Sequence, residues 1–482
     1  MTPTTILLTI LAYFAAMYAV SLLSGRRADN AAFFSGGHGS RWWVVALAMV
    51  SACMSGVTFV SVPGMVGVSG FGYLQMCIGF FLGYLVIAFV LTPLYFRLGV
   101  VSIYQYLEQR FGLGAYRTGA WFFFISKMLG ASVRLFLLCL TLQLLVFGPW
   151  GVPFWINALC NVAVCLLYTY RGGVRSVIWT DVLKTGCMLL AVTLCLYFIA
   201  RDLGGIRIHE QTFFFDDINH PQYFWKQLVG GLFTVVAMTG LDQDMMQRTL
   251  ACKNVRDSQK NLVVSSLLQA AVIALFLCLG ALLYQYAAVH GIAETGDRLF
   301  PAVATEGSLP AAVGILFIIG LVSSAYGAGG SALTSLTTSF SVDILGTKGR
   351  DEAVVTRTRK RVHWAMAAGM ALTITVFNAV NSTSAIDAVY KLASYTYGPI
   401  LGLFSFGILT RAKVRDRYVP IVSLAAPVIC FILQMNAERW FGGYHFSYEL
   451  LLLNAGLTFL GLTCLIERGP RPQEAAARRE KR

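Results

Sequence analysis

The chain has 482 residues, of which 57% are hydrophobic and only 12% are charged, and its mean hydropathy is +0.67. A soluble domain carries about 25% charged residues because its surface faces water. This composition excludes a soluble enzyme, a disordered chain and a secreted disulfide scaffold, and it indicates an integral membrane protein. The net charge of +14 would suit a nucleic-acid partner, but the positions of the charges argue against that class.

Apolar stretches long enough to cross a bilayer as a helix, about 20 residues each, recur throughout the chain. They predict an all-α integral membrane protein with about 13 transmembrane helices. The stretches cover residues 4–24, 42–66, 73–96, 120–146, 152–170, 178–200, 223–241, 263–288, 311–342, 363–380, 385–409, 418–436 and 448–466.

Lysine and arginine are concentrated in every second loop. One set of loops includes the clusters at 248–260, 348–361 and 411–417, whereas the opposite loops carry acids near 202–217 and 294–297. Loops rich in lysine and arginine stay in the cytoplasm. We therefore expect a multi-pass protein of the cell inner (plasma) membrane with its N-terminus outside and its C-terminus cytoplasmic. The excess positive charge thus determines how the chain is oriented in the lipid bilayer. We expect no nucleic-acid partner.

Enzyme and pump motifs are missing from the sequence. There is no GxxxxGK[ST] loop for ATP, and the spans hold no nucleophile–base or metal constellation that would support catalysis. The run Gly327-Ala328-Gly329-Gly330 lies inside an apolar stretch, where small residues favour close helix packing. We expect no enzyme and no cofactor, with Na⁺ considered only as a coupling ion.

Charged side chains at membrane depth are costly and by default mark function. Lys127 and Arg134 are seven residues apart in the fourth stretch, so both face one side of that helix. They either form structural ion pairs or contact an anionic substrate. Asp181 and Lys184 open the sixth stretch. Asp181 either sits favourably at a helix N-terminus or serves an ion path.

Two stretches have the composition of broken helices. The segment 51–64 in the second stretch mixes Gly and Pro with Ser and Thr, and the segment 230–240 in the seventh holds three Gly and two Thr. Discontinuous helices in corresponding places of two halves free carbonyls for cations and helix N-termini for anions. The two stretches are five spans apart, as an inverted five-plus-five repeat requires. This pattern favours a secondary transporter.

Several segments resemble motifs of the sodium:solute symporter family, and together they are spread over residues 33–410. The segment 170–182, YRGGVRSVIWTDV, is the most specific of them. The others are 41–47 (RWWVVAL), 93–97 (PLYFR), 102–111 (SIYQYLEQRF), 242–250 (DQDMMQRTL), 334–343 (TSLTTSFSVD) and 397–404 (YGPILGLF).

This resemblance implies a LeuT-like inverted-repeat core that works by alternating access. It predicts a single transporter domain over 1–482. Within it we expect a leading helix at 1–25, the five-plus-five core at 40–410, two extra C-terminal helices at 411–467 and a cytoplasmic polar tail at 468–482.

The family's conserved sodium site is made of backbone carbonyls on the first core helix together with a carbonyl and two hydroxyls on the eighth. The resemblance places the carbonyls at Ser51, Met54 and Ser324. The hydroxyl positions fall on Gly327 and Ala328, which have no side-chain oxygen. Because a hard cation wants several oxygens, the sequence leaves sodium coupling open.

A second sodium site, found in the sialic-acid branch of the family, would use Asp181, Gly327, Gly330 and Ser331. Two of these four residues offer oxygen. Proton coupling through Asp181, or uncoupled passage, is the alternative to sodium. The predicted ion-binding residues are Ser51, Met54, Ser324, Asp181 and Ser331, with Gly327 and Ala328 at degenerate positions.

The substrate site is also predicted by resemblance. Met238 and Thr239 stand where the family's sugar transporters place an aromatic pair, which argues against a hexose. In the sialic-acid branch a basic residue on the third core helix grips a carboxylate. Its aligned place falls near Gly130, one turn from both Lys127 and Arg134. For Tyr73, core packing is the alternative. The predicted substrate-binding residues are Ser55, Thr58, Tyr73, Gln75, Lys127 and Arg134.

The sequence thus predicts a secondary active transporter that couples a cation, Na⁺, to uptake of a small polar organic anion, with sialic acid as one example. The first alternative is a proton-coupled or uncoupled carrier of the same fold. The second, from another class, is a transporter-like sensor that binds a ligand without moving it. The expected partners are a small-molecule substrate, a coupling cation and the bilayer.

The predicted topology can be tested with two reporters fused in turn to the C-terminus. Green fluorescent protein should fluoresce and alkaline phosphatase should be inactive, because the first folds in the cytoplasm and the second needs export. Fusions in the 202–217 loop should give the reverse pattern. An active phosphatase at the C-terminus would invert the assigned orientation.

Overall fold

This computed structural model describes residues 3–25, 33, 39–170, 173–205, 212–217, 220, 222–306, 309–347, 349–380, 385–440, 446 and 449–467. The predicted polar tail at 468–482 lies outside the described residues, as do Arg171 and Gly172 of the most specific family motif. A local pair expected between Asp387 and Lys391 also falls outside, since the side chain of Asp387 is not described.

The described chain is helical almost throughout. Short π-helical turns extend or join several of the helices, at Ile87–Leu91 (η2), Gln143–Phe147 (η3), Val236–Gly240 (η4) and Phe340–Ile344 (η6). The α-helices are α1 Pro3–Gly25, α3 Trp42–Cys53, α4 Gly56–Ser69, α5 Tyr73–Val86, α6 Thr92–Leu98, α7 Gln105–Arg110, α8 Leu113–Leu142, α9 Phe154–Thr169, α10 Gly173–Asp202, α11 Phe224–Val235, α12 Gln243–Thr249, α13 Val255–His290, α14 Leu299–Glu306, α15 Ala311–Ser339, α16 Glu352–Val380, α17 Ala385–Leu409, α18 Val419–Met435, α19 Ala437–Trp440 and α20 Glu449–Cys464.

Among the described residues, nine helices are long and apolar enough to cross a membrane, and two bent helix pairs bring the number to eleven. The helices α9 and α20 are apolar but shorter. Every predicted apolar stretch overlaps one of these helices or pairs, so the all-helical, multi-span fold is confirmed. Whether α9 and α20 cross the bilayer on their own stays a prediction.

Both stretches predicted to be broken are broken. The helices α3 and α4 meet at an angle of 64°, and α11 with η4 meets α12 at 72°. At the first break Met54 and Ser55 take extended backbone angles, so the ladder of helical hydrogen bonds stops there. At the second break the carboxylate of Asp242 caps α12 by accepting hydrogen bonds from the amides of Asp244 and Met245.

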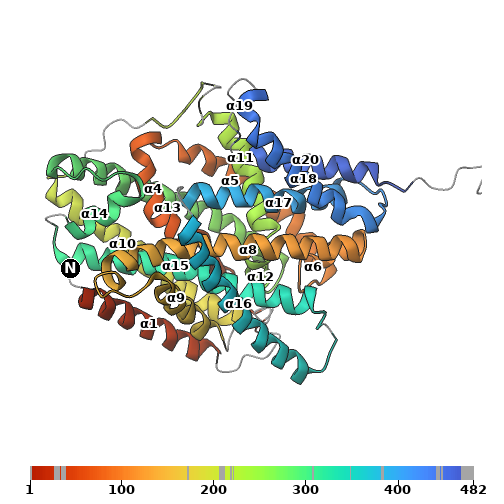
Figure 1. Ribbon diagram of the computed structural model, residues 1–482, viewed down its shortest axis with the longest axis horizontal. Coiled ribbons are helices and arrows are strands. Elements are labelled where there is room, and N and C mark those ends of the chain that lie inside the picture. Colours follow the sequence, from red (N-terminus) through yellow and green to blue (C-terminus); the bar gives the residue numbers. More distant parts are fainter. Residues whose placement is uncertain are drawn as a thin grey trace, which may run out of the picture.

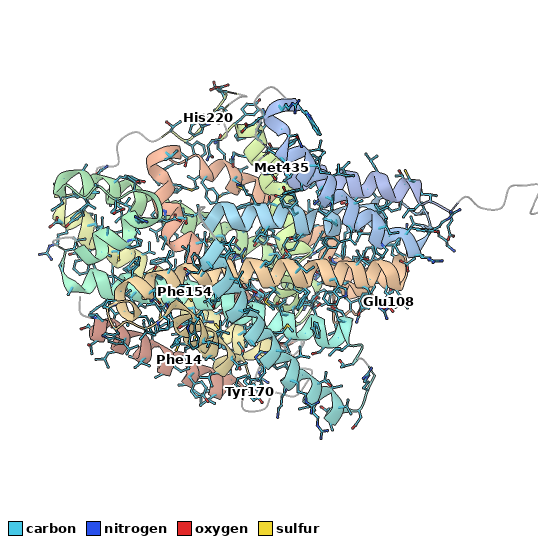
Figure 2. The ribbon with its side chains drawn as sticks, viewed as in Figure 1. Phe14, Glu108, Phe154, Tyr170, His220 and Met435 are labelled. Carbon is cyan, nitrogen blue, oxygen red and sulfur yellow. The ribbon has the colours of Figure 1, made fainter. Side chains whose placement is uncertain are left out.

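Most of the long helices run side by side across the view in Figure 1, with the start of α1 at the left and the end of α20 at the right. The described ends of the chain therefore lie at opposite ends of the bundle in this view (Figure 1). Side chains fill the space between the helices, and Glu108 lies near the right-hand end of α8 (Figure 2).

Glycines bring α5 and α11 into close contact. A Cβ added at Gly79 would lie 2.2 Å from the carbonyl oxygen of Leu228, and one at Gly83 would lie 2.2 Å from the Cγ1 atom of Val235. Gly231 faces the backbone of α5 in the same way. Small residues four apart let backbones approach, which is how membrane helices gain packing energy without a hydrophobic driving force.

The leading and trailing helices pack on the core through polar contacts. Ser21 of α1 donates a hydrogen bond to the carbonyl of Tyr168 on α9. The amide of Asn454 on α20 donates to the carbonyl of Ser394 on α17, 2.9 Å away, and Gly398 makes room for it. These contacts hold α1 and α20 against the core.

The α5–α11 contact makes a prediction about stability. Gly79→Ala should lower the free energy of unfolding by about 1–3 kcal/mol, because the new methyl group has no room beside Leu228. The matched control is Gly186→Ala on α10, where an added Cβ meets nothing within 4 Å. Thermal melting of the detergent-purified variants measures both. Equal melting temperatures would refute the close approach.

Candidate functional site

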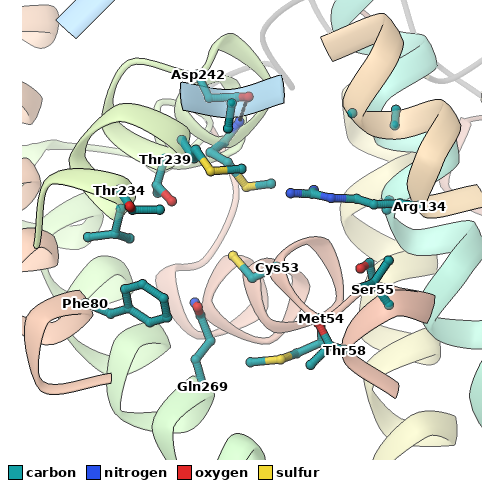
Figure 3. Close-up of a pocket in the computed structure, with 18 of the residues that line it drawn as sticks. Cys53, Met54, Ser55, Thr58, Phe80, Arg134, Thr234, Thr239, Asp242 and Gln269 are labelled. Carbon is teal, nitrogen blue, oxygen red and sulfur yellow. Dashed lines mark hydrogen bonds between the residues drawn. The ribbon is translucent and has the colours of Figure 1, made fainter. Parts of the chain in front are cut away.

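A cavity of about 140 Å³ lies where the two helix breaks face α8, α13 and α17 (Figure 3). One water needs about 10–15 Å³ of such space, so the cavity holds on the order of ten waters or a compact organic molecule. Its polar side chains include Ser55, Thr58, Tyr73, Tyr84, Ser126, Lys127, Arg134, Thr234, Thr239, Asp242, Gln269 and Tyr397.

The first break places a helix N-terminus at this cavity. Ser55 is the N-cap residue of α4, yet its side chain makes no capping hydrogen bond, and both Ser55 and Thr58 line the cavity. The first amides of a helix have no partner within the helix and carry partial positive charge. Such an end favours an anion.

Arg134 extends from α8 into the cavity, between Asp242 on one side and Ser55 on the other (Figure 3). Its guanidinium makes no ion pair or hydrogen bond with any residue that the structure describes. A planar group with five donors is suited to a carboxylate. Arg134 is thus a charge that a bound anion would match.

Lys127, the other predicted cation on α8, has a different setting. Its ammonium lies 3.1 Å from an oxygen of Asp242 and 2.8 Å from an oxygen of Asp244, and all three side chains are nearly inaccessible. Of the two roles left open by the sequence, the structural ion pair is the one observed for Lys127. It also borders the cavity, but its charge is shared by the two acids.

The ion pairs continue away from the cavity through Arg248. One end of its guanidinium lies 3.0 Å from Asp244 and the other 3.1 Å from Asp181. Asp181 in turn lies 3.0 Å from the ammonium of Lys184. Acids and bases therefore alternate along a buried chain, which we call the ion-pair chain, from Asp242 through Lys127, Asp244, Arg248 and Asp181 to Lys184.

Of the two settings left open for Asp181, the helix N-terminus is not the one observed. α10 begins at Gly173, so Asp181 lies two turns inside the helix, where it is fully buried. What stabilises its charge is the pair of cations on either side rather than the helix dipole.

The predicted ligands of the conserved sodium site are partly brought together. A Cβ added at Gly327 of α15 would lie 2.5 Å from the hydroxyl and 2.7 Å from the carbonyl oxygen of Ser51. The last helical bond of α3 runs from the amide of Met54 to the carbonyl of Val50, so the carbonyls after Val50 lie at the open end of the helix. Ser324 lies on the same part of α15, with its hydroxyl bonded to its own helix.

Of the remaining predicted site residues, some line the cavity and others make contacts elsewhere. Tyr73 and Ala328 line the cavity. Gln75 does not: its amide donates to the carbonyls of Gly72 and Gln222 and accepts from the amide of Phe215, so it holds the start of α5 to the following loop segment. The hydroxyl of Ser331 donates to Asp244, 3.1 Å away, rather than facing Asp181.

Residues of the site that sequence reasoning missed come from the second break, from α8 and from α17. Asp242 borders the cavity and accepts a short hydrogen bond from Tyr397. Ser126 lines the cavity and is bonded to Thr396, 2.7 Å away. The motifs that contain Asp242 and Tyr397 were visible in the sequence, but their partners lie more than a hundred residues away.

Two broken helices around a cavity that charged, polar and apolar side chains line together define a multi-span transporter of the LeuT-like fold. Residues 33–414 match the model of the sodium:solute symporter family, so the chain belongs to that family of transporters and is not an enzyme. The fold is similar to that of a Na⁺-coupled sialic acid symporter, with a TM-score of 0.80, 20% identity and coverage of 95% of this chain and 97% of that one. It also resembles Mhp1, a nucleobase-cation-symport-1 family transporter, at a TM-score of 0.55 and 13% identity over 89% of this chain and 92% of that one.

Related sequences transport different solutes. The sodium-coupled monocarboxylate transporter 1 of Xenopus laevis is 26% identical over 442 residues, which cover 85% of this chain and 66% of that protein. A sodium/sialic acid symporter of Aliivibrio fischeri is 24% identical over 88% of this chain and 86% of its own length. The human sodium/iodide cotransporter is 27% identical over 55% of this chain and 42% of its length.

The ion-pair chain makes a prediction about Lys127. Lys127→Gln should lower the free energy of unfolding by about 3–5 kcal/mol, because it leaves two buried carboxylates short of a counter-charge. Melting of the substrate-free protein measures the loss. Lys253→Gln, at an exposed position, should have little effect. A Lys127 variant as stable as the control would show that the lysine is not a structural partner.

Proposed function

We propose that the protein is a secondary transporter that takes up a small organic anion in symport with a cation, Na⁺, by alternating access. The observation that carries the proposal is Arg134, a cation without a protein partner among the described residues, which extends into a cavity at the two helix breaks. Arg134 is partly buried, and an unmatched charge with only part of its surface in water is costly, so a bound anion stabilises this site more than a neutral solute would.

The substrate class we propose is a compact carboxylate. Besides Arg134, the charged side chains among the described lining residues are Lys127 and Asp242, and Lys127 is shared by two acids. Arg134 and the N-terminus of α4 therefore dominate the field in the described part of the cavity, and the hydroxyls of Ser55 and Thr58 offer hydrogen bonds.

The size of the cavity admits more than one of the carboxylates that relatives carry. Room for about ten waters, each of which takes about 30 Å³ in the liquid, accommodates a monocarboxylate easily and is also on the order of the volume of sialic acid. Met238 and Thr239 line the cavity, where a hexose carrier of this family would present aromatic rings. Sialic acid therefore stays a candidate, and the binding test below separates it from the shorter acids.

For the cation we propose a site between the end of α3 and α15. The hydroxyl of Ser51 is buried without a hydrogen-bond partner among the described residues, and it lies where a side chain at Gly327 would be. A hydroxyl supplied by α3 thus compensates for the one missing from α15. With the carbonyls of Ser51 and Met54 and an oxygen of Ser324, it makes a set of hard ligands suited to Na⁺.

A proton-coupled or uncoupled carrier is the second candidate. It is favoured by Ala328, the other predicted hydroxyl position, whose methyl group faces the cavity and brings no oxygen. In either case the two broken helices supply flexible points near mid-membrane, about which the halves of an inverted repeat can move. We keep the orientation expected from the loop charges, with uptake into the cytoplasm.

The proposal is tested by ligand-stabilised melting of the detergent-purified protein with short monocarboxylates, sialic acid and hexoses, in Na⁺ or K⁺ at fixed ionic strength. Binding to the folded state raises the melting temperature by mass action. A monocarboxylate should stabilise the wild type in Na⁺ more than in K⁺. Arg134→Gln should weaken that binding by about 10- to 100-fold, since a hydrogen bond to a charged group contributes about 1.5–3 kcal/mol.

Arg117→Gln is the matched control, because it removes an exposed arginine from the same helix. It should bind as the wild type does. Stabilisation by hexoses alone would refute the anion site, and equal carboxylate binding in Na⁺ and K⁺ would favour the proton-coupled or uncoupled carrier.

A further inference from the structure

The end of the ion-pair chain at Lys184 is arranged like a cation site that is already filled. The ammonium of Lys184 lies 3.0 Å from an oxygen of Asp181, 3.0 Å from the hydroxyl of Tyr168 and 3.3 Å from the carbonyl oxygen of Tyr326. It also lies 4.3 Å from the centre of the Tyr168 ring. The side chain is fully buried. A carboxylate, a hydroxyl and a carbonyl thus converge on one positive charge from α10, α9 and α15.

A missing side chain on α15 makes this arrangement possible. A Cβ added at Gly330 would lie 1.6 Å from the hydroxyl of Tyr168. Any larger residue at this position would therefore displace Tyr168, which donates to the carbonyl of Tyr326 and meets Lys184. The absence of a side chain at Gly330 thus leaves the space in which the hydroxyl of Tyr168 contacts Lys184.

The negative charge of Asp181 is already neutralised, so no further cation is needed beside it. The two oxygens of Asp181 are engaged separately, one by Lys184 and the other by Arg248. Along the ion-pair chain the three acids are balanced by three bases. A further monovalent cation on Asp181 would add an uncompensated charge a few ångströms from an ammonium, at a depth where such a charge is costly.

We propose that Lys184 is a fixed cation, whose tethered ammonium holds the place at Asp181 that an exchangeable alkali cation would otherwise take. This inference rests on the proposed sodium-coupled function, because it concerns how many ions accompany the substrate. The transporter then binds Na⁺ at the Ser51–Ser324 site alone. Asp181 is a fixed anion of the protein rather than a ligand of a transported ion.

The first experiment removes the ammonium with Lys184→Gln and compares melting in Na⁺, K⁺ and choline at fixed ionic strength, without substrate. The variant should melt below the wild type in choline, and Na⁺ should raise its melting temperature more than it raises that of the wild type, because Asp181 becomes free to bind an ion. Lys260→Gln, at an exposed position, should respond as the wild type does. A folded Lys184 variant with the wild-type response to Na⁺ would overturn the proposal.

The second experiment measures Na⁺ activation of carboxylate uptake in proteoliposomes. The Hill coefficient, which is bounded by the number of sites, should be about 1 for the wild type and rise toward about 2 for Lys184→Gln. If Lys184→Gln does not fold, the double variant D181N/K184Q, which removes one charge of each sign, should keep the wild-type Na⁺ activation. Its loss, or a wild-type coefficient near 2, would make Asp181 a sodium ligand and overturn the proposal.

The two proposals fail in different ways. If Na⁺ does not stimulate uptake of any carboxylate by the wild type, the proposed function falls. The melting comparison then still tests Lys184, because it measures ion binding without substrate or transport.

Discussion

The structure depends on the neutralisation of charge at membrane depth. A single unmatched ion there costs several kcal/mol, so the ion-pair chain must form whenever α8, α10 and α12 come together. It fixes the short helix α12 after the second break, because Asp244 and Arg248 lie one turn apart on it and bind Lys127 of α8 and Asp181 of α10. The one guanidinium that this pairing leaves over in the cavity is that of Arg134. The pairing of buried charges that stabilises the fold therefore also leaves Arg134 as the cation available to a ligand.

Much of the fold could be predicted from the sequence, because in a bilayer each backbone group must be satisfied within its own helix or barrel. An apolar run of about 20 residues is therefore expected to form a transmembrane helix. The breaks were also predictable, since Gly56 and Pro63 interrupt an apolar run and so do the glycines of 230–240. What the pattern cannot show is where the helix restarts. Asp242 decides that at the second break, through a cap that depends on two local amides.

The candidate site was less predictable, because its roles depend on partners far away in the chain. Lys127 and Arg134 share a helix face and a charge, and nothing local tells them apart. Lys127 is bound because Asp242 and Asp244, more than a hundred residues later, come within 3.1 Å of it. Gln75 looked equally suited to the cavity, but the carbonyl of Gln222 engages its amide. The resemblance to a family could place residues in the right region without deciding which of them are free.

Gly327 and Gly330 of α15 both stand at positions that the family resemblance assigns to ion sites. At each of them the lack of a side chain admits a different neighbouring group. At Gly327 the missing side chain admits the hydroxyl and carbonyl of Ser51, both neutral oxygens, and this is where we propose that a cation binds. At Gly330 the missing side chain admits Tyr168 and, through it, the ammonium of Lys184. The second replacement brings a full charge that cannot leave. A lost hydroxyl therefore does not by itself say that a cation site is lost. Whether a cation can still bind depends on the group that fills the space. A neutral oxygen offers a ligand to a cation, whereas an ammonium takes the cation's place.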